Sequence, residues 1–145
     1  MAIRGPVPES SSKWASCIAL IEPTTGKKQI IELENNEAAF SVCVVNATQE
    51  HAHSETYVVV GTAVGLQLSP RSAQKYFLLV YRFVSATCEL AFLHRTPVNE
   101  LAMCLCEFNG KLLAGMAHCI RLYEIGIKQM LRKCEARGFP STVMR

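Results

Sequence analysis

Residues 99–125 read NELAMCLCEFNGKLLAGMAHCIRLYEI, and this stretch decides the fold. In its centre, Asn109-Gly110 separates two apolar runs, Glu100–Phe108 and Lys111–Met116. Asn-Gly is the strongest short signal for a β-hairpin, because a type I′ turn needs positive φ at both central residues. A third apolar run, Cys119–Ile125, follows after two residues. The stretch therefore predicts three antiparallel strands joined by tight turns.

The same series of segments occurs earlier in the chain. Asn36–Val42 (NEAAFSV) aligns with Asn99–Leu105 (NELAMCL) as the opening of a first strand. Three more pairs of segments follow in the same order. The second strands, Tyr57–Thr62 and Lys111–Met116, share a glycine, and the third strands, Phe77–Arg82 and Cys119–Glu124, share a tyrosine. The fourth strands are Glu89–Arg95 and Gln129–Lys133. Recurring units of four short strands are typical of β-propeller blades.

Outside these units, Lys13–Ile21 and Lys27–Leu33 form one more strand pair, the outer half of a preceding blade. We therefore expect an all-β partial β-propeller of about two and a half four-stranded antiparallel blades. Closed propellers contain ~4–8 blades, so this chain is not expected to close by itself. A β-sandwich, which would accommodate ten strands without missing partners, is the alternative fold. By range, we expect 1–12 to be a disordered N-terminal segment, 13–135 the partial propeller and 136–145 a tail.

The strand boundaries follow from turn residues. Loops are expected around Pro23–Gly26, at Asn46–Ser54 and at Leu66–Ala73. The complete set of expected strands is Lys13–Ile21, Lys27–Leu33, Glu37–Val45, Thr56–Thr62, Tyr76–Val84, Cys88–Arg95, Glu100–Phe108, Lys111–Met116, Cys119–Ile125 and Lys128–Glu135.

Composition excludes several classes of function. Of the 145 residues, 50% are hydrophobic and 19% are charged, the net charge is +3, and all twelve acidic residues are Glu. The absence of Asp excludes EF-hand loops, aspartic dyads and Asp-dependent magnesium sites for phosphoryl transfer. No apolar run reaches the ~18 residues of a membrane span, so no membrane partner is expected. Because no secretion signal is present, we expect a reducing compartment and seven cysteines that act mainly as small core residues.

Two groups of residues could support chemistry instead. His51 and His53 could bind a metal from one loop, and Cys104 with Cys106, near Cys119, could form a thiolate cluster. Together they define the alternative function, a small metal- or thiol-dependent enzyme. No acidic residue or cysteine follows the histidines at ligand spacing, and packing explains the cysteines better. We therefore expect no catalytic residue, metal site or cofactor.

Several separated blocks resemble one known family. Lys13–Ser16, Leu33–Val42, Pro70–Ser72, Phe92–Val98 and Leu131–Glu135 resemble the large propeller subunit of splicing factor 3b. Glu107–Ala114 and Arg121–Glu124 are also similar to the large subunit of the damaged-DNA-binding complex, which is a sister family. The large subunit of the cleavage and polyadenylation specificity factor is another sister family. Met1–Ser12 and Gly138–Arg145 show no family counterpart, which suggests a fragment or truncated product.

The resemblance implies a nuclear, non-enzymatic interaction scaffold in the branch-site recognition complex of pre-mRNA splicing. Its partners would be other splicing factor 3b subunits, with RNA contacted indirectly or weakly and no small-molecule substrate. An adaptor of the damaged-DNA-binding and ubiquitin-ligase type is the alternative within the same superfamily.

The candidate partner-binding residues lie in and beside the Leu66–Ala73 loop. This loop is long for a turn within a blade, and surface loops on a rigid sheet are where partners are usually contacted. We expect Leu68, Pro70, Arg71 and Lys75 to bind a partner. Three short basic spots, Lys27-Lys28, Arg71–Lys75 and Arg132-Lys133, could contact phosphates, but solvated blade edges explain them better.

Overall fold

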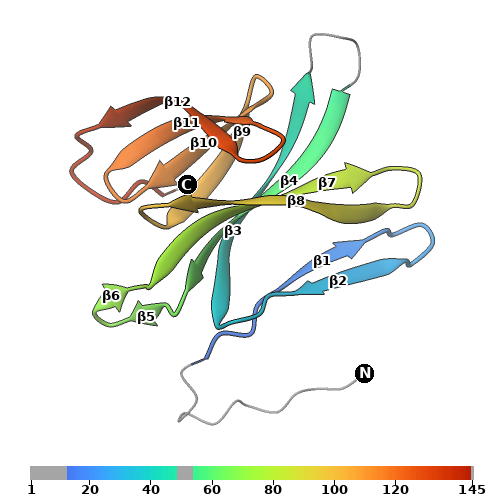
Figure 1. The fold of residues 1–145 in the computed structure, drawn as a ribbon, viewed down its shortest axis with the longest axis horizontal. Helices are drawn as coiled ribbons and strands as arrows, with labels where there is room; N and C mark the ends of the chain where they lie inside the picture. Colours follow the sequence, from blue (N-terminus) through green and yellow to red (C-terminus); the bar gives the residue numbers. More distant parts are fainter. Residues whose placement is uncertain (1–12, 49–53, 145) are drawn as a thin grey trace.

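The computed structural model describes residues 13–48 and 54–144, and all regular elements within these ranges are strands (Figure 1). In chain order the strands are β1 (Cys17–Ile21), β2 (Lys28–Glu32), β3 (Glu37–Thr48), β4 (Ser54–Val64), β5 (Gln67–Leu68), β6 (Arg71–Ser72), β7 (Lys75–Val84), β8 (Glu89–Val98), β9 (Ala102–Phe108), β10 (Lys111–Met116), β11 (Cys119–Ile125) and β12 (Met130–Arg137).

The strands form two four-stranded antiparallel sheets and two hairpins. The first sheet has the order β3-β4-β7-β8 and the second β9-β10-β11-β12, while β1-β2 and β5-β6 pair separately. Neighbouring strands in each large sheet also follow one another along the chain, interrupted only by the small β5-β6 insertion between β4 and β7. This order is the meander of a propeller blade and differs from the Greek key of a sandwich. The sheets do not close into a ring. The expected all-β partial propeller of about two and a half blades is confirmed.

Strand registers confirm the internal repeat residue by residue. In the first blade Gly61 pairs with Ser41, and in the second Gly115 pairs with Cys104, as the alignment requires. Three residues before each glycine, the second strand pairs with the shared tyrosine, Tyr81 or Tyr123. The two tyrosines therefore occupy equivalent positions on their third strands.

The irregularities of the two blades are repeated as well. In each first strand, the residue just before the one that pairs with glycine has no partner in the neighbouring strand. This residue is Phe40 in β3 and Met103 in β9. In each fourth strand one residue is skipped beside the shared tyrosine, Leu93 in β8 and Lys133 in β12. A β-bulge locally bends and twists its strand, so matching bulges give the two blades the same curvature.

The Asn109-Gly110 turn forms as expected. Both residues have positive φ, 48° and 72°, and Lys111 pairs with Phe108 directly across the turn. The Glu107 side chain accepts a hydrogen bond from the Gly110 N–H at 2.7 Å, which ties the turn to the end of β9. The predicted hairpin between β9 and β10 is therefore confirmed.

Some expected boundaries were wrong by a few residues. β8 continues through Pro97 to Val98, although Pro97 cannot donate to a ladder; β8 lies at the sheet edge, where one side of the strand needs no donor. β3 and β4 extend into the expected Asn46–Ser54 loop. The expected loop Leu66–Ala73 contains the short strands β5 and β6, and β12 lies two residues later than expected.

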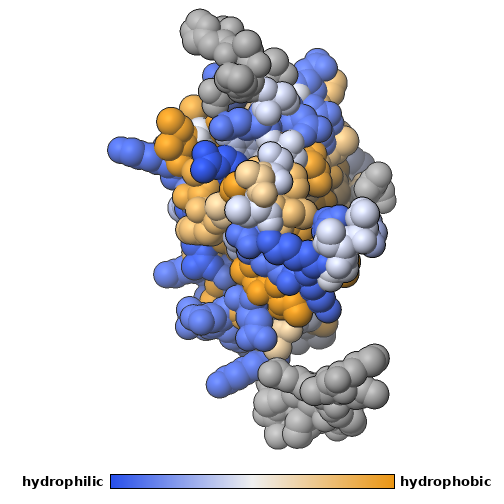
Figure 2. Space-filling view, turned by 90° about the vertical axis from the view of Figure 1, so that its right-hand side faces the viewer, coloured by the Kyte–Doolittle hydropathy of each residue, from blue (hydrophilic) through white to orange (hydrophobic). Residues whose placement is uncertain are grey.

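Most of the core lies between the two blades. Val45, Val59 and Leu78 of the first blade pack with Leu105 and Leu112 of the second. A second cluster lies on the opposite face of the first blade, where β1 and β2 pack on Leu79, Tyr81 and Leu90. In Figure 1 the β1-β2 hairpin lies beside the first blade as a separate layer. Hydrophobic and hydrophilic residues are interspersed over the outer face seen in Figure 2.

A buried histidine joins the outer parts of the two blades. His94 of β8 lies 2.9 Å, through Nε2, from the carbonyl oxygen of Gly126 in the β11-β12 turn. Its Nδ1 lies 3.3 Å from the Thr96 hydroxyl, which accepts a hydrogen bond from the Met130 N–H. Because the Gly126 carbonyl oxygen can only accept, Nε2 carries the proton of this contact, and Nδ1 can accept from the Thr96 hydroxyl when the ring is neutral. Burial lowers the pKa of His94, partly opposed by the hydrogen bond to Gly126.

The expectation that the cysteines act mainly as core residues was wrong for most of them. Only Cys119 is buried, and Cys43, Cys88 and Cys104 are half-buried. The exposed cysteines Cys17, Cys106 and Cys134 lie on strands whose outward faces have no second layer among the described residues. Apolar runs in the sequence therefore overestimated burial, because this architecture leaves strand faces uncovered.

Candidate partner-binding surface

The Leu66–Ala73 segment projects from the first blade as the small β5-β6 hairpin (Figure 1). Its base is fixed by Leu66, which is buried with Ala63 and Leu101. The indole N–H of Trp14 donates to the Leu66 carbonyl oxygen at 2.8 Å, and the Trp14 ring packs edge-on against Phe40. Anchoring at the base lets the tip of the hairpin project while its position stays fixed.

Three of the four expected partner-binding residues lie together in this hairpin. Leu68 of β5 pairs with Arg71 of β6, and Pro70 lies in the turn between them. The Leu68 side chain is 65% exposed, and Pro70 and Arg71 are exposed as well. An Arg71 guanidinium nitrogen lies 2.9 Å from the Met103 sulfur of the second blade. Lys75 is exposed at the start of β7, just beyond the hairpin.

The three basic spots differ in how their charges are matched. Lys27 forms an ion pair with Glu89 at 3.0 Å and Lys133 forms one with Glu124 at 2.7 Å. Within residues 13–48 and 54–144, neither Arg71 nor Lys75 has a carboxylate partner. The β5-β6 hairpin, with Lys75 beside it, therefore combines an exposed leucine with two cations that remain available for an acidic group. The sequence alone did not distinguish these cations from the paired ones.

A buried polar cluster lies at the start of β3, and the sequence did not predict it. Glu37 is 3% exposed and accepts hydrogen bonds from the Thr62 hydroxyl and from Arg95. Arg95 also lies over the Phe77 ring, 4.2 Å from its centroid. These contacts neutralise and fix the carboxylate, so the cluster orders the end of the first blade and leaves no free group for chemistry.

The equivalent region of the second blade has different polar contacts. Met116 stands where the first blade has Thr62, and a buried Glu100 oxygen, Oε2, has no hydrogen-bond partner within the described ranges. Arg121 is almost fully buried and donates to Glu135 and to Asn99. Hydrogen bonds from Arg137 and Arg121 lower the pKa of the Glu135 carboxyl. The repeat thus preserves backbone geometry while its polar contacts change.

Of the residues in the alternative enzyme reading, the structure describes only the cysteines. His51 and His53 lie outside the described residues. Cys104 is half-buried and its thiol lies 3.8 Å from the Val143 carbonyl oxygen, whereas Cys106 is exposed. Among the residues that the structure describes, no three His, Cys or Glu side chains lie together as a metal site would need. In the same part of the chain there is no helix that could cross a membrane.

Comparison with known proteins gives a consistent result. The family model described as the CPSF A subunit region matches residues 15–144. This range includes residues 138–144, for which the sequence suggested no counterpart. In the structure, this last segment lies against the second blade, where the Val143 N–H donates to the Ala117 carbonyl oxygen at 2.8 Å.

Three curated relatives are splicing proteins by name. The chain is 42% identical to spliceosome-associated protein 130 A of Arabidopsis thaliana over 136 residues, 40% identical to the pre-mRNA-splicing factor rse1 of Emericella nidulans over 139 residues, and 38% identical to splicing factor 3B subunit 3 of Danio rerio over 143 residues. These alignments cover 92%, 94% and 98% of the chain. The chain spans only 11–12% of the length of these relatives.

Proposed function

Because the chain belongs to the family of the CPSF A subunit region, we propose that it is a non-enzymatic interaction scaffold in pre-mRNA splicing. Its partners are other subunits of the splicing factor 3b complex, and it acts in the nucleus, where RNA is contacted indirectly or weakly. The names of its relatives support this assignment, since each is a splicing factor or a spliceosome-associated protein.

One structural observation carries the proposed contact site. The β5-β6 hairpin presents Leu68, Pro70 and Arg71 on a rigid base, with Lys75 beside them. An exposed apolar side chain next to unmatched cations suits a protein surface that is apolar in its centre and acidic at its rim. We therefore assign these four residues to partner contact within a splicing complex.

The test is co-purification of the tagged full-length chain from nuclear extract, read by mass spectrometry for splicing factor 3b subunits. We expect the Leu68→Asp/Arg71→Glu variant to lose these subunits at least tenfold relative to wild type. Lys28→Glu, which reverses an exposed charge on β2, is the matched control and should retain them. Failure of the wild-type chain to recover any splicing factor 3b subunit would contradict the proposal.

A further inference from the structure

The outer edge of the second blade is the strand β12, and most of the backbone along this edge has no partner. Among the described strands β12 pairs only with β11, on one side. On the other side, the Thr96 hydroxyl accepts a hydrogen bond from the Met130 N–H at 2.8 Å and closes the start of the edge. No other side chain within residues 13–48 and 54–144 forms a hydrogen bond with the backbone of β12, so the edge is open beyond Met130.

The internal repeat shows that the equivalent edge of the first blade is blocked. β8 is the fourth strand of the first blade, as β12 is of the second. The Gln29 side chain accepts a hydrogen bond from the Leu90 N–H at 2.7 Å and donates one to the Leu90 carbonyl oxygen at 3.1 Å. Near the other end of β8, Pro97 has no N–H to donate. Capping and proline both discourage the addition of a strand, and β12 has neither beyond Met130.

Three charged side chains lie on the same face of β12, and these are Arg132, Glu135 and Arg137. Their partners on β11 are three alternate residues, which are Tyr123, Arg121 and Cys119. Alternate residues of a strand share a face, and directly paired residues lie on the same face of a sheet, so the three charged side chains form one row. The bulge at Lys133 keeps this row in phase, because β11 spans it with the single residue Leu122.

The row carries more positive charge than its own carboxylate can match. Glu135 forms ion pairs with Arg132, at 3.5 Å, with Arg137 and with the buried Arg121. No other carboxylate among the described residues forms an ion pair with any of these three arginines. The side chains of Arg132 and Arg137 are 57% and 72% exposed, and both share one carboxylate that Arg121 already holds. Each guanidinium has five N–H donors, so both retain donors for a further carboxylate.

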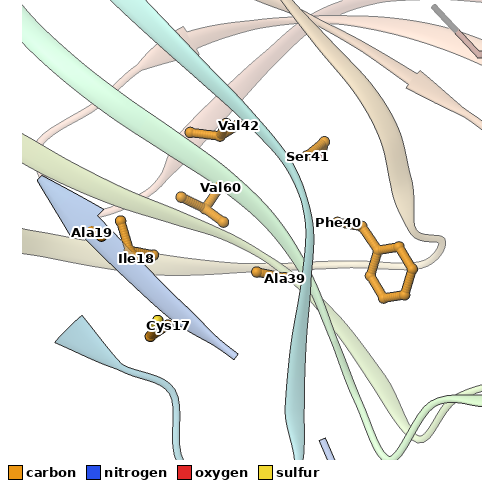
Figure 3. Close-up of a pocket in the computed structure, with 8 residues that line it drawn as sticks. All are labelled: Cys17, Ile18, Ala19, Ala39, Phe40, Ser41, Val42 and Val60. Carbon is orange, nitrogen blue, oxygen red and sulfur yellow. The ribbon is translucent and has the colours of Figure 1, made fainter. Parts of the chain in front are cut away.

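The groove between β1 and β3 lacks such a charge. Its volume is about 290 Å³, and side chains such as Ile18, Val42 and Val60 line it (Figure 3). None of the described residues that line it is charged, so nothing in this groove selects one class of partner. The edge of β12 does select one, because its exposed arginines favour an acidic partner.

We propose that the open edge of β12 binds an extended acidic segment of another protein, which adds to the second blade as a fifth strand. Backbone hydrogen bonds to β12 give affinity, and carboxylates opposite Arg132 and Arg137 give selectivity. An uncharged residue lies opposite Glu135, because a carboxylate there would face a like charge. The two residues between these positions lie on the other face, beside the exposed Cys134 and Ala136.

The segment that fits this edge therefore alternates in the order acidic, apolar, uncharged polar, apolar, acidic. A second copy of β12 fits poorly, since each edge carries two exposed arginines for one glutamate. The surface is separate from the β5-β6 hairpin, and the inference does not depend on the proposed splicing role.

The experiment measures binding of the fluorescein-labelled peptide Thr-Val-Glu-Val-Thr-Val-Glu-Val-Thr to the full chain by fluorescence anisotropy. Its pattern is the same in both directions, so it fits β12 in either orientation. We expect it to bind about tenfold or more tightly than the same peptide with lysine at both glutamate positions. Arg132→Gln/Arg137→Gln should remove this preference. The matched control is Arg82→Gln, the same change at an exposed arginine of β7, and it should keep the preference. A preference that survives the double substitution, or that Arg82→Gln also removes, would overturn the proposal.

Two measurements on the unsubstituted chain test strand pairing itself. The peptide is N-methylated either at its four valines or at its two glutamates and central threonine. Because the N–H groups of alternate residues point to the same edge of a strand, only one of these sets should weaken binding, by about tenfold or more. Equal binding of the two methylated peptides would mean that no strand is added.

The bound peptide should also slow the reaction of the exposed Cys134 of β12 with maleimide, while Cys17 of β1 reacts as before. Protection of both thiols or of neither would place the peptide elsewhere and contradict the proposal. If Cys134 is instead protected in a dimer without peptide, a second copy occupies the edge and the proposal is also wrong.

Discussion

Gly61 lies where the first blade comes close to Ala102 of the second, and replacing it by alanine tests the interface between the blades. A Cβ at this position would lie 2.5 Å from the Ser41 hydroxyl oxygen, 2.9 Å from the Ala102 carbonyl oxygen and 3.1 Å from the Ala102 Cβ. The Ser41 hydroxyl already donates to that carbonyl oxygen at 2.6 Å. The new methyl group would therefore push β9 away from β4.

The magnitude follows from two opposing effects. Overpacking of this kind costs about 1–3 kcal/mol, whereas replacing a strand glycine by alanine recovers about 0.4–1 kcal/mol from the unfolded chain. Because the Ala102 oxygen is backbone, it cannot turn away, and the clash outweighs the gain. We expect a net loss of about 1–2 kcal/mol, which corresponds to a melting temperature lower by about 3–8 °C for a domain of this size.

The assay is thermal unfolding of Gly61→Ala followed by circular dichroism, with a double-mutant cycle against Ser41→Ala. Removing the Ser41 oxygen takes away the nearest contact but leaves the Ala102 oxygen, so the double variant should recover only part of the loss. A Gly61→Ala melting temperature equal to or above that of wild type would refute the close approach of β4 and β9.

Three further outcomes are expected. Lowering the pH from 7 to 5 should destabilise the wild type more than His94→Gln, because the unfolded histidine binds a proton near its ordinary pKa of 6.5 while the folded ring, whose pKa is lowered, does not; parallel pH curves would contradict this. Thr62→Val should cost about 1.5–3 kcal/mol in urea unfolding, since the buried Glu37 carboxylate loses a hydrogen bond; a smaller effect than that of Thr56→Val, a half-buried threonine on the same strand, would contradict it. Leu112→Ala should cost about 2–5 kcal/mol, because Leu112 is fully buried between the blades, and an unchanged midpoint would mean that the blades do not pack through it.

Backbone geometry was the part of the fold that the sequence predicted best. The shared glycines, the shared tyrosines and the Asn109-Gly110 turn each predict a strand position or a turn from a few neighbouring residues. The strand registers agree with all of these predictions. Burial was predicted less well, because it depends on which other strands lie over a face. Val42 and Leu105 are both apolar and occupy equivalent positions, yet one is exposed and the other is buried.

The candidate site was predicted in outline only. The length of the Leu66–Ala73 segment and its Pro70 identified a projecting feature, but the pairing of Leu68 with Arg71 needed the structure. The same holds for charge matching. Lys27 and Arg71 look alike in the sequence, and only the spatial position of Glu89, sixty-two residues after Lys27, separates a neutralised cation from an unmatched one.

The three exposed cysteines have a practical consequence for spectroscopy. Cys17 lies on β1, Cys106 on β9 and Cys134 on β12, so each thiol marks a different edge strand. Because Cys119 is buried, it should react with maleimide dyes far more slowly than these three. Replacing the half-buried Cys43, Cys88 and Cys104 and two of the three exposed cysteines by serine leaves one principal attachment point. Keeping both Cys17 and Cys134 would turn the separation between the first hairpin and the last strand into a fluorescence energy-transfer signal. The chain therefore carries natural labelling positions at its first hairpin, its second blade's inner edge and its last strand.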